Sequence, residues 1–313
     1  MTTSKLDFQN INFNMKTMID DYTFKYGENS CQHSFVSSFL LYDKYGDMFC
    51  EKDDFLYTLR SRRGNQGERV YLYPLGDYEN SDGLINALEN IFDDAHSHNC
   101  KVKFETLTEH AKNTVLKLFP DKFIVEPSRD YAEYVYKVEK LSTLKGGELA
   151  RKRQYLNRFL KEYNGRFRTE KIKPEYFADI LKFQQEWLEN KNSIDTDPTH
   201  QAYLEIENKE IYEAFRYFNE LEISGIVLFI DDVVKGYFFG CPLSENCYTD
   251  IVNKADRNIT GIYGFLVGEF LRNCCADYLY INRQEDLGVA GLRKIKTEFK
   301  PDFLIDKFIL AEV

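Results

Sequence analysis

The sequence predicts an α+β protein that is built from two tandem copies of one unit. Two observations support this prediction. The chain has 313 residues, which is about twice the commonest domain size. Helix and strand patterns follow the same order in both halves, namely helix, strand hairpin, helix, strand, helix, strand. We place the boundary at Gly146 and Gly147, which gives domains at residues 1–145 and 146–313.

The first copy begins with a short helix in SFVSSFLLYDKYG, residues 34–46. Alternating apolar residues on both sides of the turn RRGNQGE, residues 62–68, predict a strand hairpin. The next helix has Ser81 or Asp82 as its N-cap and one apolar face. Three further elements complete the copy: a strand at 101–107, a helix at 108–119 capped by Thr108, and a strand at 122–127.

The second copy begins with a helix at residues 148–165, which has one apolar face and one basic face and stops at Gly165. A hairpin is expected to turn at Asp231 and Asp232. The other predicted elements are strands at 166–172, 246–255, 277–286 and 306–313, and helices at 173–191, 260–275 and 287–299.

Composition and charge exclude several classes of protein. No stretch approaches 18 uninterrupted apolar residues, and the first 30 residues lack a signal-peptide core, so we expect a cytoplasmic protein. The net charge of −10 argues against indiscriminate binding to nucleic acid or anionic lipid. Residues 145–173, however, hold ten Lys or Arg against three Glu, a local charge of +7. This basic segment is a candidate contact for RNA phosphates or a solvated helix face.

The cysteines and histidines give no metal site or disulfide framework. Seven cysteines are an odd number, and none forms a CxxC pair, which favours buried thiols in a reducing compartment. His96, His98 and Cys100 would point apart on a helix. We therefore predict no metal.

Charged residues gather in INRQEDLGVAGLRKIKTEFKP, residues 281–301, where a strand is expected to end. Strand alternation sends Arg283 and Glu285 to one face, where Glu285 could act as a general base. The alternative is an N-cap by Asp286 with a local ion pair. The helix that follows places Leu292, Ile295 and Phe299 on its core face, and Arg293, Lys296 and Lys300 on a cationic face. That face suits a phosphate, a carboxylate or the acceptor end of a tRNA, or is simply solvated.

Glycines mark the start of the helix at 260–275. Gly261, Gly264 and Gly268 would allow close approach of a ligand, or close packing of the helix on the sheet. After Arg257 the glycines come at 261 and 264, a spacing that differs from the usual coenzyme A signature.

Three motifs, NKADRNITGIYG (253–264), YINRQEDLGVAGLRKIK (280–296) and FKP (299–301), resemble the DUF2156 family, which is related to the C-terminal domain of phosphatidylglycerol lysyltransferase. The resemblance implies two tandem GNAT-like (acyl-CoA N-acyltransferase fold) domains, as in Fem-type aminoacyl-tRNA-dependent transferases, each with a mixed, mainly antiparallel sheet flanked by helices. Asp250, before TGI (260–262), matches the aspartate before the family's NGI helix start, and Lys296 matches a lysine of its terminal pattern. Two positions depart from the pattern, Asn253 and Glu298, where the lysyltransferases carry basic residues.

This resemblance implies transfer of an aminoacyl or acyl group to an amine or hydroxyl acceptor, such as a small molecule or a lipid head group. Aminoacyl-tRNA, bound through residues 145–173, and acyl-CoA are the candidate donors. The candidate catalytic residues are Asp250, Glu285 and Lys296, and the candidate ligand-binding residues are Arg257, Gly261, Tyr263, Gly264, Arg283 and Arg293. A CoA-dependent N-acetyltransferase and a non-enzymatic binding module on the duplicated fold remain alternatives. In every version we expect Asp250, Gly261, Glu285 and Lys296 to rim a gap between strands.

Overall fold

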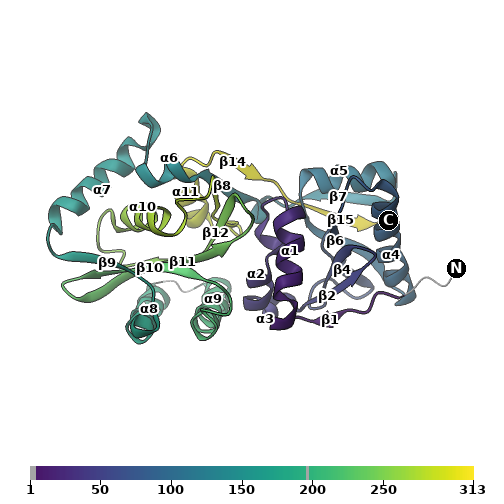
Figure 1. Ribbon diagram of the computed structural model, residues 1–313, viewed down its shortest axis with the longest axis horizontal. Helices are drawn as coiled ribbons and strands as arrows, with labels where there is room; N and C mark the ends of the chain where they lie inside the picture. Colours follow the sequence, from purple (N-terminus) through teal and green to yellow (C-terminus); the bar gives the residue numbers. More distant parts are fainter. Residues whose placement is uncertain (1–4, 195–196) are drawn as a thin grey trace. The chain divides into compact units, whose positions relative to one another are not determined.

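The structure is a computed structural model that describes residues 5–194 and 197–313. The chain divides into two compact units, each described by itself below. The first unit comprises the chain up to Glu133 together with Glu285–Val289 and Leu304–Val313, and the second comprises Tyr134–Gln284 and Ala290–Phe303. Each unit has its own sheet with helices against it (Figure 1), so the predicted α+β class and duplicated arrangement are confirmed.

The first unit is built on a sheet with the strand order β1-β2-β3-β4-β6-β15-β7, in which β5 also pairs with β3. All neighbouring pairs are antiparallel except β4 with β6. The strands are β1 (Gln9–Asn10), β2 (Asp47–Lys52), β3 (Phe55–Arg60), β4 (Glu68–Tyr71), β5 (Leu75–Gly76), β6 (Lys101–Leu107), β7 (Phe123–Pro127) and β15 (Phe308–Glu312). The helices are α1 (Lys16–Tyr26), α2 (Phe35–Leu40), α3 (Tyr42–Tyr45), α4 (Ser81–Ser97) and α5 (Glu109–Leu118), with 3-10 turns at Phe13–Met15, Cys31–His33 and Arg129–Tyr131.

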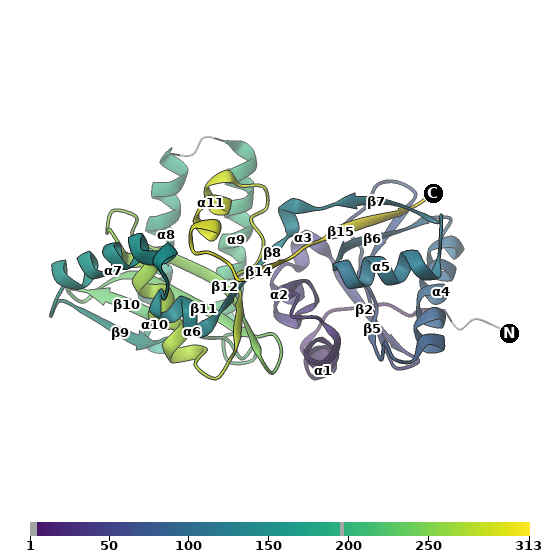
Figure 2. The same ribbon diagram turned by 90° about the horizontal axis from the view of Figure 1, so that it is seen from above.

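Strand alternation divides the first sheet into two faces. Phe55, Tyr57 and Leu59 of β3 belong to an apolar core with α4 and α5, while the neighbouring Arg60 points to the opposite face. There the Arg60 guanidinium lies 4.2 Å above the Tyr45 ring. Figure 2 shows α1, α2 and α3 on this second side.

The second unit has the strand order β14-β8-β13-β12-β11-β10-β9. Its strands are β8 (Glu133–Lys137), β9 (Phe167–Lys171), β10 (Ser224–Ile230), β11 (Val233–Pro242), β12 (Cys247–Ala255), β13 (Tyr280–Asn282) and β14 (Phe303–Ile305). Its helices are α6 (Val138–Thr143), α7 (Ala150–Glu162), α8 (Phe177–Ile194), α9 (Pro198–Arg216), α10 (Ile262–Cys274) and α11 (Ala290–Glu298), with 3-10 turns at Gly147–Leu149 and Pro174–Tyr176. Helix α10 covers one face of the sheet, and α8 and α9 cover the other (Figure 1).

Aromatic packing fixes the helices on the second sheet. On one face, the Phe238 ring of β11 stacks on Phe270 of α10 with centroids 3.9 Å apart. On the other face, the Tyr237 hydroxyl donates to Gln184 of α8 at 2.7 Å. Adjacent residues of one strand thus hold helices on opposite faces, as the period of two requires.

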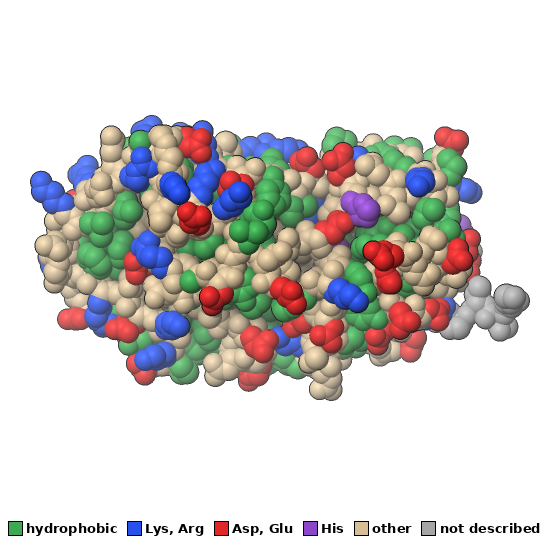
Figure 3. Space-filling model, turned by 45° about the horizontal axis from the view of Figure 1, so that its top comes forward, with side chains coloured by type: hydrophobic (Ala, Val, Ile, Leu, Met, Phe, Trp, Pro, Cys, Tyr) green, Lys and Arg blue, Asp and Glu red, His purple; other side chains and the backbone are tan. Residues whose placement is uncertain are grey.

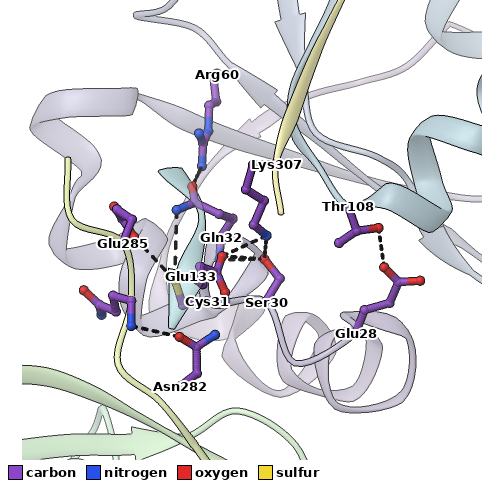
Figure 4. Close-up of polar contacts among 11 residues, drawn as sticks. Glu28, Ser30, Cys31, Gln32, Arg60, Thr108, Glu133, Asn282, Glu285 and Lys307 are labelled. Carbon is purple, nitrogen blue, oxygen red and sulfur yellow. Dashed lines mark hydrogen bonds and ion pairs between the residues drawn. The ribbon is translucent and has the colours of Figure 1, made fainter. Parts of the chain in front are cut away.

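The last strand of the chain completes the first sheet. β15 lies between β6 and β7 and pairs antiparallel with both. A boundary between residues 145 and 146 would assign this strand to the second domain. Just before it, Lys307 forms an ion pair with Glu133 at 2.8 Å, and both side chains are fully buried. Ser30 also donates to Glu133, at 2.9 Å, as Figure 4 shows. The C-terminal segment is therefore a structural part of the first unit.

Several details of the predicted elements were wrong or missing. Helices α1 and α6 were not predicted. The predicted hairpin is three strands, because β2 and β3 join at Asp53 and Asp54, which both adopt positive φ. The cap of α4 is Asn80, whose side chain accepts from Gly83 N. Helix α9 was not predicted. In contrast, the Thr108 cap of α5 and the turn at Asp231 and Asp232 are confirmed.

Candidate active site

The sheet of the second unit opens between β12 and β13. These strands run parallel, and their last pair is Thr249 with Asn282. Beyond it, Arg283 N donates to Tyr134 O at 2.8 Å, so this segment stays with β8 while β12 continues along β11. Asp250 and Arg283 are the first residues past the last pair, one on each side of the opening.

Three of the predicted residues meet at this opening. Arg283 Nε donates to Asp250 Oδ2 at 2.7 Å, and their side chains are 8% and 12% exposed. Lys296 Nζ, from α11, donates to Arg283 O at 2.6 Å. This carbonyl is open to Lys296 because its expected partner in β8, Tyr134 N, donates instead to Gln284 O at 3.1 Å. Asp250, Arg283 and Lys296 are hereafter called the charged triad.

Helix α11 is turned differently from the prediction. Leu292 and Ile295 were expected in the core, but they are 36% and 50% exposed, while Lys296 is 8% exposed. Phe299 is buried as expected. The three residues predicted to form one cationic face therefore differ: Lys296 turns inward and bonds to the backbone at the strand opening, while Lys300 is exposed to solvent. Arg293 lies half-buried on the same helix.

Two buried polar atoms near the charged triad lack a hydrogen-bond partner among the described residues. They are Arg283 Nη1, a donor, and Asn253 Oδ1, an acceptor. Asn253 pairs in register with Phe238, and the Arg283 guanidinium lies 5.8 Å from the Phe238 ring. A buried donor or acceptor without a partner is costly, so both atoms favour a polar ligand: Arg283 Nη1 at the opening, and Asn253 Oδ1 three residues further along β12 from Asp250.

Tyr136 is a contributor that sequence reasoning missed. Its hydroxyl donates to Lys296 O at 2.7 Å, which fixes α11 against β8. Burial raises the pKa of Tyr136, so the phenol stays protonated and keeps this bond. The signal was present in the alternating tyrosines of YAEYVYK, residues 131–137, which we interpreted only as an extended run.

Three residues predicted to bind a ligand near the start of α10, namely Gly261, Tyr263 and Arg257, contact other groups than the charged triad. Gly261 is the N-cap with φ 88°, and a Cβ there would lie 2.1 Å from Tyr155 O of α7. Tyr263 donates to Ala255 O at 3.1 Å. The Arg257 guanidinium lies 5.0 Å from the Trp187 ring. Gly261 is therefore required for close packing, and the ligand-binding roles of these residues stay predictions.

Alanine at Gly261 should destabilise the protein by about 2 kcal/mol or more, because the position needs a left-handed backbone and has no room for a Cβ. Gly264 is the matched control: it lies within the same helix, and its Cβ would meet nothing within 4 Å. Gly264→Ala should raise the free energy of unfolding by about 0.5–1 kcal/mol. Urea denaturation of both variants measures the difference. Equal stability of the two would contradict the close contact with α7.

Glu285 belongs to the first unit. Its Oε2 lies 3.9 Å from Cys31 Sγ, which donates to it, and Figure 4 shows the two side chains facing each other. Burial raises the pKa of the Cys31 thiol, so it remains a neutral donor. The structure joins Asp250 and Lys296 through Arg283, and the assignment of Glu285 as a base stays a prediction.

The first unit has a parallel strand pair equivalent to β12 and β13, but different side chains follow the last pair. β4 and β6 are also parallel, and their last pair is Tyr71 with Phe104. The next residues are Leu72 and Glu105, where the second unit has Asp250 and Arg283. One residue further on, Thr106 and Gln284 both have φ 56°. The two units therefore share the same backbone conformation at this point, including the positive φ, whereas the pair formed by Asp250 and Arg283 occurs in the second unit.

Two sheets, each with a parallel pair that parts beside a helix, define a tandem fold of the acyltransferase type. The chain belongs to the family described as "Phosphatidylglycerol lysyltransferase, C-terminal", which it matches over residues 24–311. This confirms the resemblance found in the motifs.

Individual relatives agree with this assignment. A conserved protein of unknown function from Bacteroides thetaiotaomicron has a crystal structure that is 27% identical, with a TM-score of 0.88, 98% of this chain covered and 100% of that one. The structure of L-PGS from Bacillus licheniformis is 14% identical with a TM-score of 0.62, covering 94% and 91%, and shows the same fold. An uncharacterised protein of Mycoplasmoides gallisepticum is 25% identical over 184 residues, covering 58% of this chain but only 56% of its own length.

Two further findings concern membrane-spanning helices and disulfide bonds. Across the described residues, no helix combines the length and the apolar character that crossing a bilayer requires. The seven cysteines all lie within the described residues and none forms a disulfide; five of them are buried.

Proposed function

We propose that this chain is an aminoacyltransferase that moves an α-aminoacyl group onto an amine or hydroxyl acceptor at the opening between β12 and β13. The observation that carries the proposal is the buried charged triad at the point where the strands part. Asp250 Oδ2 is held by Arg283. Among the described residues no hydrogen bond occupies Oδ1, which leaves that oxygen for a ligand or a proton.

The groups around the opening match the parts of the reaction. The nucleophile attacks the ester carbonyl of the donor and loses its proton to Asp250; the ester C–O bond then breaks, and the departing ribose oxygen takes this proton back from Asp250 and leaves as a hydroxyl. Arg283 Nη1, which lacks a partner among the described residues, donates to the carbonyl oxygen as negative charge develops on it. Asn253 Oδ1 accepts from the ammonium of the aminoacyl group. Backbone N–H groups near Gly261 are a further candidate for the carbonyl.

A donor with an ammonium group fits these residues better than an acetyl group, because an acetyl group gives Asn253 Oδ1 no donor. We therefore place aminoacyl-tRNA ahead of acyl-CoA. Figure 3 shows Lys and Arg side chains gathered over the part of the second unit that carries α6 and α7. Arg151, Arg158 and Lys161 are exposed there and would contact RNA phosphates. A tRNA donor also implies a cytoplasmic protein.

Lysyl transfer to phosphatidylglycerol, the reaction named in the family description, is not what we propose. Asn253 and Glu298 stand where the lysyltransferase pattern carries basic residues. Glu298 is engaged by Lys152 of α7 at 2.7 Å. We propose an acceptor that is a small molecule or a lipid head group, with its identity set by these differences.

Thermal unfolding tests the donor class directly. A non-hydrolysable aminoacyl-adenosine, with an amide in place of the ester, should raise the melting temperature in a saturable way, since a ligand that binds only the folded state stabilises it. Acetyl-CoA should not. The shift should shrink in Asn253→Leu, which removes the oxygen proposed to accept from the ammonium of the donor. A shift with acetyl-CoA alone would favour a CoA-dependent acyltransferase, and no shift with either would favour a non-enzymatic binding module.

A further inference from the structure

A cavity of about 500 Å³ lies within the first unit, apart from every residue of the charged triad. It is enclosed by the N-terminal segment at residues 5–8, the ends of β3 and β4, and the last turns of α4. β3 and β4 are paired in register at Leu59 and Tyr71, with a backbone hydrogen bond from Leu72 N to Thr58 O at 3.0 Å beside this pair. The volume is ample for a molecule of six to ten heavy atoms.

One part of the cavity wall is apolar. Leu6, Phe8, Met48, Leu59 and Val70 line it. Leu6, Leu59 and Val70 are buried core residues, while Phe8 and Met48 are partly buried. This wall suits an aliphatic or aromatic side chain of a ligand.

A buried carboxylate lines the cavity from α4. The Asp94 side chain is 1% exposed. Its Oδ2 accepts from Arg69 Nη2 at 2.8 Å and from the Tyr71 hydroxyl. Its Oδ1 has no hydrogen-bond partner among the described residues. Burial raises the pKa of Tyr71, which therefore remains a donor and not a competing anion.

Cationic side chains line the same cavity. Lys5 is exposed and Arg63 is 35% exposed. Arg63 donates to Glu105 at 3.3 Å through both Nε and Nη2. The cavity thus combines a buried carboxylate oxygen that has no hydrogen-bond partner among the described residues and lies 3.9 Å from His98 Nδ1, cations nearer to solvent, and an apolar wall. Asp7 and Glu68 line it as well.

We propose that this cavity binds a free α-amino acid with an apolar side chain. Its ammonium donates to Asp94 Oδ1, its carboxylate pairs with Lys5 or Arg63, and its side chain packs on Phe8 and Met48. Binding is reversible and involves no bond formation. This is a second site in the first unit, independent of the transfer site proposed above.

Isothermal titration of the full chain with L-leucine tests the proposal. We expect saturable binding of one leucine per chain. N-acetyl-leucine lacks the ammonium and leucinamide lacks the carboxylate, and each should bind at least tenfold more weakly. No saturable binding of leucine, or equal binding of the two blocked analogues, would overturn the proposal.

Variants separate this site from the transfer site. Asp94→Asn should weaken leucine binding at least tenfold. Because Asp94 also holds Arg69 and Tyr71, Met48→Trp provides a second variant that fills the cavity from a partly buried position and should abolish binding while the melting temperature stays near that of the wild type. Asp250→Asn should bind leucine as the wild type does. Leucine binding that survives Met48→Trp but is lost in Asp250→Asn would assign the amino acid to the transfer site instead.

Discussion

Asp250→Asn should lower the rate of aminoacyl transfer at least about 100-fold, the lower end of the contribution of a positioned acid or base. The substitution keeps the shape of the side chain but removes the charge that Arg283 Nε holds at 2.7 Å. The proton of the nucleophile then has no carboxylate to accept it. Single-turnover transfer with saturating donor measures the change.

Asp256→Asn is the matched control. Asp256 directly follows the last residue of β12, the strand that carries Asp250, and pairs with Lys235 at 3.4 Å, so it lies away from the opening. The Asp256→Asn variant should transfer the aminoacyl group at the wild-type rate. A folded Asp250→Asn protein with near wild-type activity would remove Asp250 from the mechanism, and circular dichroism melting of both variants checks the fold.

Lys307→Met should have the largest effect on stability. Removing one partner of a buried ion pair typically costs about 3–5 kcal/mol, because the other charge is left buried. Here the remaining charge is Glu133, and both side chains are fully buried. The loss also weakens the attachment of β15, so the free energy of unfolding of the first unit should fall by this amount in urea.

Two companion variants control this prediction. Lys117→Met removes an exposed lysine of α5 in the same unit and should change stability by no more than about 0.5 kcal/mol. Lys307→Met combined with Glu133→Gln removes both charges and should recover part of the loss. A single Lys307→Met variant as stable as Lys117→Met would show that the pair does not fasten the C-terminal segment.

Local signals predicted much of the fold. The turn at Asp231 and Asp232 was identified because it lies between two long apolar runs. The same Asp-Asp signal at Asp53 and Asp54 was missed, because the glycine-rich loop at 62–68 offered a competing turn nearby. Strand β15 could be located along the chain, but its partners could not, because pairing with β6 and β7 is a contact between the two ends of the sequence.

The sequence identified several residues of the candidate site correctly, but it did not predict how their side chains are arranged. Asp250 and Lys296 entered through the resemblance, and the structure links them through Arg283. Helical periodicity could not reveal that Lys296 turns inward, because the cause is the Arg283 carbonyl, whose expected partner Tyr134 N bonds to Gln284 O instead. The membership of Glu285 in the first unit depends on where the chain crosses between units, which local patterns do not encode.

The most direct test of the central claim follows label from charged tRNA. Total tRNA charged with radiolabelled amino acids is incubated with the purified protein and an extract of small molecules and lipids from its host. We predict that label from at least one amino acid moves to a compound with an amine or hydroxyl, and that Asp250→Asn and Lys296→Ala abolish this movement. Label that stays on the tRNA for every amino acid, or moves equally well with both variants, would contradict the account.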